Sequence, residues 1–404
     1  MIKQHLLQGF CVVVLALAFI GPAQAVTVYE KDGKRVDVGA RIQVEYLHVS
    51  PDCAPGAPCF IEDDGTLSIF DTDEWFFRRL RPYISGTLFK DWMGKVEFDF
   101  GEAEDSNEVQ IKDAYFSYSG FGKNLLYIGN AKSVFAREFL TSSAELQLVE
   151  RGFTGDHNDG VPDRALGVRW DGKMLEGKLS YAANVGAQHH DPAVNRMDFD
   201  SPVNNAADWN EGLVFAARVD VHPLGSPIPF SQADLDRGPS RISAGVGGFY
   251  WSNDGDNNTY TDAVTGVALD PERPDLDQAE GVEVSAAYRG HGGSVDAAWQ
   301  IVNGDTVDPT FTGGLYLNGS TQLDKLSVVG GYLVWKDAIE VVAGWESQDA
   351  DNYEDKFERT SLGVNWYLHG HKLKVQATYR KVDNFIGLAG QKQDVWFGST
   401  QYVF

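Results

Sequence analysis

The chain has 404 residues, and its 58 acidic and 34 basic side chains give a formal net charge of −24. This negative balance argues against a nucleic-acid-binding protein, which needs a basic surface to displace counterions from phosphates. After residue 25 no apolar run approaches the ~20 residues of a membrane-spanning helix, which excludes a helical membrane protein but not a β-barrel.

Residues 1–25 are predicted to be a cleaved signal peptide. Lys3 provides the positive start, Phe10 to Ile20 the apolar centre, and Ala23-Gln24-Ala25 the small-residue cleavage site. An uncleaved anchoring helix is the alternative. We expect residues 26–404 to form the exported protein.

Two of the three cysteines remain after cleavage, Cys53 and Cys59. An exported protein meets an oxidising compartment, so these residues are predicted to form a short disulfide. They have no histidine neighbours and make a poor zinc site. No metal site and no cofactor is expected.

From residue 35 onward, apolar and polar residues alternate with a period of two, as in strands with one apolar face. No segment reads as a long amphipathic helix. Residues 313–321 could form a further strand, but we assign them to a loop. In an outer-membrane barrel both termini lie on the same side, which requires an even number of strands. The pattern predicts 16 strands, near 35–48, 74–90, 92–101, 109–118, 123–131, 164–171, 174–187, 212–222, 239–251, 280–290, 292–302, 326–335, 338–347, 357–368, 371–383 and 391–404.

The connections between these strands are alternately tight and long. A soluble sandwich also alternates, but short turns at one rim and long polar loops at the other are typical of an outer-membrane barrel. The tight turns are Lys90-Asp91, Asp171-Gly172-Lys173, Gly290-His291, Lys336-Asp337 and His369-Gly370. The long loops are 50–73, 188–211, 252–279, 303–325 and 347–356, and they hold much of the acidic surplus.

Aromatic residues support the same architecture. Tyr46, Trp92, Trp335 and Tyr379 end the apolar faces, where interfacial girdles lie. The chain also ends on a strand whose last residue is Phe404, which resembles the terminal signature of bacterial outer-membrane proteins. The sequence therefore predicts an all-β, antiparallel transmembrane barrel with an open lumen, that is, a pore.

The segment from Arg78 to Gly167 resembles the phosphate-selective porin family, porins O and P. The matching pieces follow one another in order and include Arg78-Arg79-Leu80-Arg81, Val96-Glu97-Phe98-Asp99-Phe100, Lys112-Asp113-Ala114-Tyr115-Phe116, Ile128-Gly129-Asn130-Ala131-Lys132, Glu150-Arg151-Gly152 and Asp163-Arg164-Ala165-Leu166-Gly167.

This resemblance implies a homotrimeric channel of the bacterial outer membrane, in contact with lipid and lipopolysaccharide, that passes small anions such as phosphate. It also implies a constriction loop folded into the lumen, here about residues 132–163. The expected pore-lining, anion-guiding residues are Arg79, Arg81, Lys132, Arg137, Arg151 and Arg164. Alternation alone directs Arg79 and Arg81 to the lumen, opposite to Leu80 and Ile84.

Two other classes of function stay open. The 132–163 segment also holds Glu138, Glu145, Glu150, Asp156, Asp159 and Asp163, so a general or weakly cation-preferring porin is the alternative. A plugged structural barrel or a barrel enzyme is less favoured. Thr141-Ser142-Ser143 lacks an evident base, and the acidic stretches at 156–160 and 254–258 do not complete a calcium loop.

Overall fold

The computed structural model describes residues 25–52, 72–101, 109–204, 210–255, 273–335 and 338–404. The predicted signal peptide and the predicted Cys53–Cys59 disulfide lie outside these residues. No helix among the described residues is long and apolar enough to cross a membrane.

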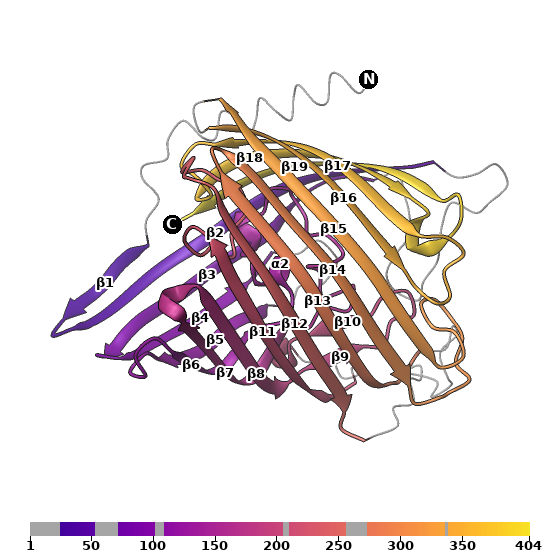
Figure 1. The fold of residues 1–404 in the computed structure, drawn as a ribbon, viewed down its shortest axis with the longest axis horizontal. Coiled ribbons are helices and arrows are strands. Elements are labelled where there is room, and N and C mark those ends of the chain that lie inside the picture. The colour runs from indigo at the N-terminus through magenta and orange to yellow at the C-terminus, as the bar shows by residue number, and fades with distance from the viewer. Residues whose placement is uncertain (1–24, 53–71, 102–108, 205–209, 256–272, 336–337) are drawn as a thin grey trace.

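Sixteen antiparallel strands form a closed barrel, as the alternation predicts (Figure 1). Each strand pairs with the next, and the last pairs with the first from Val403 opposite Arg41 to Lys392 opposite Asp52. The barrel strands are β2 (Lys34–Asp52), β3 (Thr72–Phe89), β4 (Trp92–Asp99), β5 (Gln110–Tyr118), β6 (Leu125–Lys132), β7 (Arg164–Met174), β8 (Leu179–Ala187), β11 (Gly212–Leu224), β12 (Arg241–Asn253), β13 (Leu276–Gly290), β14 (Gly293–Thr306), β15 (Ser320–Trp335), β16 (Ile339–Asp349), β17 (Phe357–Tyr367), β18 (Leu373–Asp383) and β19 (Lys392–Val403).

Three shorter strands lie outside this ring. β1 (Val26–Lys31) pairs with the start of β2 in a hairpin that projects from the barrel (Figure 1). β9 (His189–Asp191) and β10 (Asp198–Asp200) form a separate hairpin. In the described part of the chain, helical structure is limited to α2 (Arg137–Leu140) and the 3₁₀ turns Ser143–Glu145, Leu175–Gly177, Pro202–Asn204 and Phe385–Gly387.

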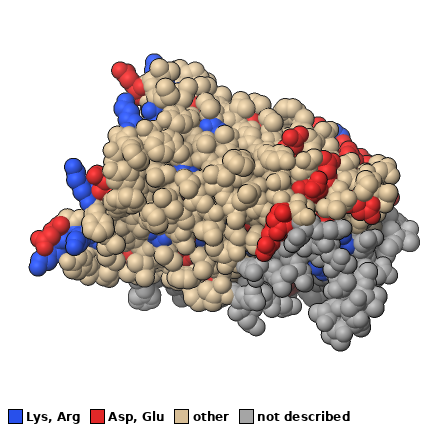
Figure 2. Space-filling view, turned by 90° about the horizontal axis from the view of Figure 1, so that it is seen from below, with Lys and Arg blue, Asp and Glu red and all other residues tan. Residues whose placement is uncertain are grey.

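The outer surface is apolar between two charged ends. Along β11 the outward residues Leu213, Phe215, Val219 and Val221 are exposed, whereas their neighbours are buried. Figure 2 shows a broad band with few charged side chains, and Asp and Glu gather at the end that carries the long connections. We call this end the loop end and the other, which carries β1 and Phe404, the turn end. In an outer-membrane barrel the turn end faces the periplasm.

Two turns differ from the prediction. β7 continues through Asp171-Gly172-Lys173 to Met174, where a turn was predicted. Asp171 forms an ion pair with Arg169 on the same strand, with 2.7 Å between Oδ2 and Nη2. The reversal comes at Leu175 and Glu176, which have φ values of 49° and 58°. After β13 the turn is His291-Gly292, one residue later than predicted.

An apolar cluster fills part of the lumen towards the loop end. Side chains from three connections meet inward-facing side chains of the barrel there, and Trp251 is fully buried among them. The Trp251 indole Nε1 also donates a hydrogen bond to the Gln188 carbonyl oxygen at 2.8 Å. The connections contribute Phe135, Val161, Val194, Met197, Phe199, Phe311 and Tyr316, and the strands contribute Phe249, Trp251, Leu276, Val302 and Leu323.

We predict that Trp251→Ala lowers the free energy of unfolding by about 3–5 kcal/mol, since it removes a large buried side chain and leaves a cavity. Urea denaturation of the refolded barrel in detergent measures the change. Tyr29→Ala, in the exposed strand β1, is the control and should cost about 0.5 kcal/mol or less. An equal loss of unfolding free energy in the two variants would show that the cluster inside the barrel does not stabilise the fold.

Candidate functional site

The connection between β6 and β7, residues 133–163, folds back into the barrel, and we call it the inward loop (Figure 1). Its two ends are held together where Lys132 pairs with Arg164 and the Ser133 amide donates to the Asp163 carbonyl oxygen at 2.9 Å. It contains α2 and leaves Phe135, Leu146 and Phe153 almost completely buried. A long connection is therefore packed as part of the interior.

The inward loop is fixed to the barrel by side chains of the strands that bond its backbone. Lys374 Nζ donates to the Leu146 carbonyl oxygen, and Asn365 Nδ2 donates to that of Gln147, both at 2.8 Å. Gln300 Nε2 donates to the Thr154 carbonyl oxygen at 2.8 Å. These partners come from β14, β17 and β18. Arg218 of β11 also donates from Nη1 to the Phe135 carbonyl oxygen at 2.9 Å, and β2 and β3 face the edge of the loop near Ser143 and Glu150.

Four guanidinium groups gather on β2 and β3, and we call Arg41, Arg78, Arg79 and Arg81 the basic wall. Arg41 lies directly opposite Arg81 in the ladder, and Gln43 lies opposite Arg79. The register then shifts, so that Arg78 is an extra residue on β3. A bulge of this kind redirects a side chain, and Arg78 also reaches the inward loop.

The carboxylates near the basic wall do not match all of its cations. Arg78 Nε lies 2.7 Å from Glu150 Oε1, and Arg79 Nη1 lies 3.6 Å from the same oxygen. Arg81 Nε lies 2.6 Å from Asp99 Oδ2. Among the described residues Arg41 has no ion pair. Its guanidinium donates to Ser143 Oγ at 2.7 Å and to Gln43 Oε1 at 2.5 Å.

Arg81 also lies 3.9 Å from Glu97 Oε1, so Arg41 is the member of the basic wall that has no ion pair in the described part of the chain. Like charges directly opposite each other on neighbouring strands repel, and here Arg41 faces Arg81. Arg41 and Arg79 each also have a buried Nε–H without a hydrogen-bond partner. Ser142, beside the contact of Arg41 with the inward loop, is exposed. An oxyanion at this edge would relieve the repulsion and receive charge-assisted hydrogen bonds.

Lys132 and Arg151, two expected anion-guiding residues, donate their hydrogen bonds to the inward loop itself. Lys132 Nζ donates to the carbonyl oxygens of Phe139 and Thr141 at 2.5 and 3.2 Å. Arg151 donates from Nη1 to the Glu138 carbonyl oxygen at 2.6 Å and from Nη2 to that of Thr141 at 2.7 Å. Both cations thereby satisfy carbonyl groups at the end of the single turn α2.

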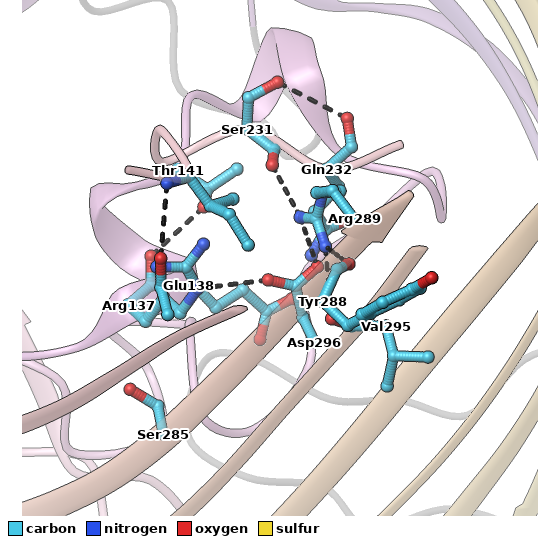
Figure 3. A network of polar contacts seen from close by, with 12 residues as sticks. Arg137, Glu138, Thr141, Ser231, Gln232, Ser285, Tyr288, Arg289, Val295 and Asp296 are labelled. Atoms are coloured by element: carbon cyan, nitrogen blue, oxygen red, sulfur yellow. Dashed lines mark hydrogen bonds and ion pairs between the residues drawn. The ribbon is translucent and has the colours of Figure 1, made fainter. Parts of the chain in front are cut away.

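Arg164 and Arg137 are separated from the basic wall by their own ion pairs. Arg164 Nε lies 2.8 Å from Asp113 Oδ1, and its Nη1 lies 3.1 Å from Asp163 Oδ1. Arg137 points to the opposite side of the barrel, where its Nε lies 3.1 Å from Asp296 Oδ1 (Figure 3). The six expected residues therefore do not form one cluster. Arg79 and Arg81 lie together, and the basic wall adds Arg41 and Arg78.

Two carboxylates of the inward loop are strongly affected by their surroundings. Burial opposes ionisation of Glu150, but the charges of Arg78 and Arg79 outweigh it and lower its pKa to about 2. Burial, and next the charge of Glu346, raise the pKa of Glu138 to about 7. Glu150 is consequently a fixed negative charge beside the basic wall, while Glu138 gives up much of its charge near neutral pH.

The other motifs of the inward loop have structural contacts. Thr141 Oγ1 donates to the Arg137 carbonyl oxygen, Ser142 Oγ accepts from the Ala144 amide, and Ser143 Oγ accepts from Arg41. His157 Nδ1 lies 2.6 Å from Asp198 Oδ1. Within the described ranges, no group of three or more His, Cys, Asp and Glu side chains is placed to hold a metal ion.

Comparisons with known proteins agree with this architecture. Residues 65–211 match the family model described as phosphate-selective porin O and P. The fold is similar to that of an anion-selective porin from Comamonas acidovorans, at 12% identity and a TM-score of 0.60, over 92% of this chain and 100% of the other. No curated protein matches the chain.

Two further solved structures have the same fold. A loop-deletion mutant of OmpT, an outer membrane protein of Vibrio cholerae, is 15% identical with a TM-score of 0.59, over 92% of this chain and 100% of the other. The outer membrane channel DcaP of Acinetobacter baumannii is 13% identical with a TM-score of 0.55, over 94% and 100%. The family match therefore covers about a third of the chain, residues 65–211, and the closed barrel of 16 strands has the fold of these outer-membrane proteins.

Proposed function

We propose that this porin is a passive diffusion channel that prefers small anions, phosphate among them, and that the anions pass along the basic wall. One observation carries the proposal. Arg41 lies opposite Arg81 without an ion pair among the described residues, and its buried guanidinium donates to Ser143 of the inward loop, next to the exposed Ser142. The family match and the anion-selective porin of similar fold support the same preference.

In this proposal the six residues expected from the sequence have different roles. Arg79 and Arg81, with Arg41 and Arg78, would replace part of the hydration shell of a passing oxyanion with bidentate hydrogen bonds. Lys132 and Arg151 position the inward loop, and Arg164 and Arg137 anchor it through carboxylates. The anion must be held weakly at each of several sites, or it would not leave.

We further propose that the porin works as a homotrimer surrounded by lipid and lipopolysaccharide. The apolar outer band supports a place in the membrane. One of the structures with a similar fold is described as a trimer form of OmpT from Vibrio cholerae, at 15% identity and a TM-score of 0.55, over 92% of this chain and 100% of the other.

A mixed-charge pore without anion preference is the alternative, and the carboxylates next to the basic wall favour it. Glu97 and Asp113 lie 2.9 and 2.7 Å from Lys95 Nζ, and Asp99 pairs with Arg81. If the passage lay beside these pairs and not beside Arg41, the local field would be close to neutral. The sign of the selectivity separates the two candidates.

We predict an anion-directed reversal potential when the purified porin is placed in a planar lipid bilayer under a KCl gradient. Phosphate added at constant chloride should reduce the chloride current, because both anions compete for the same guanidinium groups. A cation-directed potential without phosphate block would favour the mixed-charge pore. Absence of any conductance would reject the channel.

We predict that Arg41→Gln lowers the anion-to-cation permeability ratio by about fivefold, because one unit charge at ~4 Å in water is worth about 1 kcal/mol. Reversal potentials of the variant and the wild type measure the ratio. Arg35→Gln is the matched control, since Arg35 lies on the projecting hairpin and pairs with Asp37. The two variants should differ clearly. A shift of the same size in both would argue against a role for the basic wall.

A further inference from the structure

One connection at the turn end is long, although the other described turns there are short. β11 ends at Leu224 and β12 begins at Arg241, and we call residues 225–240 between them the periplasmic loop. It contains three prolines, Pro227, Pro229 and Pro239, which restrict its backbone. Gln232 and Asp234 are 3% and 1% exposed. The loop is packed into the protein and does not project from it.

The periplasmic loop runs beneath the barrel from β11 towards β18. The His291 amide, in the turn after β13, donates to the Gly238 carbonyl oxygen at 2.8 Å. Arg237 Nη2 donates to the Leu333 carbonyl oxygen of β15 at 2.8 Å. His371, just before β18, has its Nε2 3.0 Å from the Gln232 carbonyl oxygen. These contacts lie on the side of the barrel that holds the inward loop.

The periplasmic loop also supports the inward loop from below, and Gln232 is the centre of this contact. The backbone N–H of Gln232 donates to the Glu145 carbonyl oxygen at 3.1 Å. Its side-chain Oε1 accepts from the backbone N–H of Gln147 at 2.7 Å. With the contact to His371, Gln232 joins the inward loop to the barrel wall. A substitution here would release the edge of the inward loop near Ser142 and Ser143.

A second junction lies beside α2 (Figure 3). Arg289 Nη2 donates to the Ser231 carbonyl oxygen at 2.6 Å and lies 2.5 Å from Asp296 Oδ2. Arg137 Nη2 donates to the Pro229 carbonyl oxygen at 3.3 Å, while its Nε pairs with Asp296. The two arginines therefore share one carboxylate and bind two carbonyl groups of the periplasmic loop. This explains why Arg137 is directed away from the basic wall.

We infer that the periplasmic loop is a second constriction element of the channel. It covers the mouth beneath β12 to β18 and holds the inward loop through Gln232, so that solutes leave only along the side formed by the basic wall. Gln232 is then a positioning residue for selectivity. This inference rests on the proposed function, because it presupposes that the barrel conducts.

The first test replaces residues 226–239 with Asn-Gly, a two-residue hairpin turn, and measures single-channel conductance and reversal potential. The periplasmic loop reaches from β11 to the start of β18, so we expect its removal to raise conductance about twofold. Anion preference should fall, because the new route avoids the basic wall. A variant that conducts like the wild type overturns the inference, whereas a wild type without conductance rejects the proposed function instead.

The second test needs no deletion and decides the matter if the shortened chain does not fold. Gln232→Ala removes the acceptor for the Gln147 amide, so we expect larger open-channel current noise and lower anion preference. Gln232→Glu keeps an acceptor oxygen and should restore quiet currents. Gln322→Ala, at an exposed position near the loop end, is the control and should match the wild type. Quiet, wild-type currents in Gln232→Ala would overturn the positioning role.

Discussion

Hydrogen bonding of a loop backbone inside the barrel is the constraint on which the site depends. The inward loop has almost no regular structure, so its amides and carbonyl groups cannot satisfy one another as those of a helix do. A buried carbonyl group without a partner costs as much as a lost hydrogen bond. Lys374, Asn365 and Gln300 provide these partners from the barrel wall. Their positions therefore determine where the loop lies, and with it which wall stays open.

The cations in the lumen serve two purposes, and only their partners distinguish them. Lys132 and Arg151 bind carbonyl groups of the inward loop, and Arg164 is neutralised by Asp113 and Asp163. Such groups hold structure in place. Arg41 has polar partners but no ion pair among the described residues, which distinguishes it from these structural cations. The net charge of −24 is therefore a poor guide to selectivity, which depends on the charge at the passage.

The alternation of apolar and polar residues predicted the strands of this protein, because side chains of a strand point to opposite faces in turn. All 16 predicted strands correspond to strands of the barrel. Arg79 and Arg81 lie opposite Gln43 and Arg41, on the strand face that alternates with the exposed Ile84. The bulge at Arg78 was not predictable, because one extra residue leaves no periodic signal. The direction of Arg137 depends on Asp296, which lies far away in the sequence.

The periplasmic loop did leave a signal in the sequence. The predicted strands 212–222 and 239–251 are separated by a long, proline-containing stretch on the side where turns are short. The consecutive aromatics Phe249, Tyr250 and Trp251 likewise break the alternation, and two of them join the cluster inside the barrel. The periplasmic loop and these aromatic residues both mark places where connections fill the lumen. The alternation within a single strand carries no information about such contacts.

The sequence distance between the inward loop and its partners also sets an order of assembly. Leu146 is bonded by Lys374, 228 residues later, and Gln147 by Asn365, 218 residues later. These two contacts form only once β17 and β18 have joined the barrel, and closing such long segments is slow. The packing of Phe153 against Phe357 of β17 likewise waits for that strand. Part of the inward loop therefore reaches its final place late, when the C-terminal strands close the barrel.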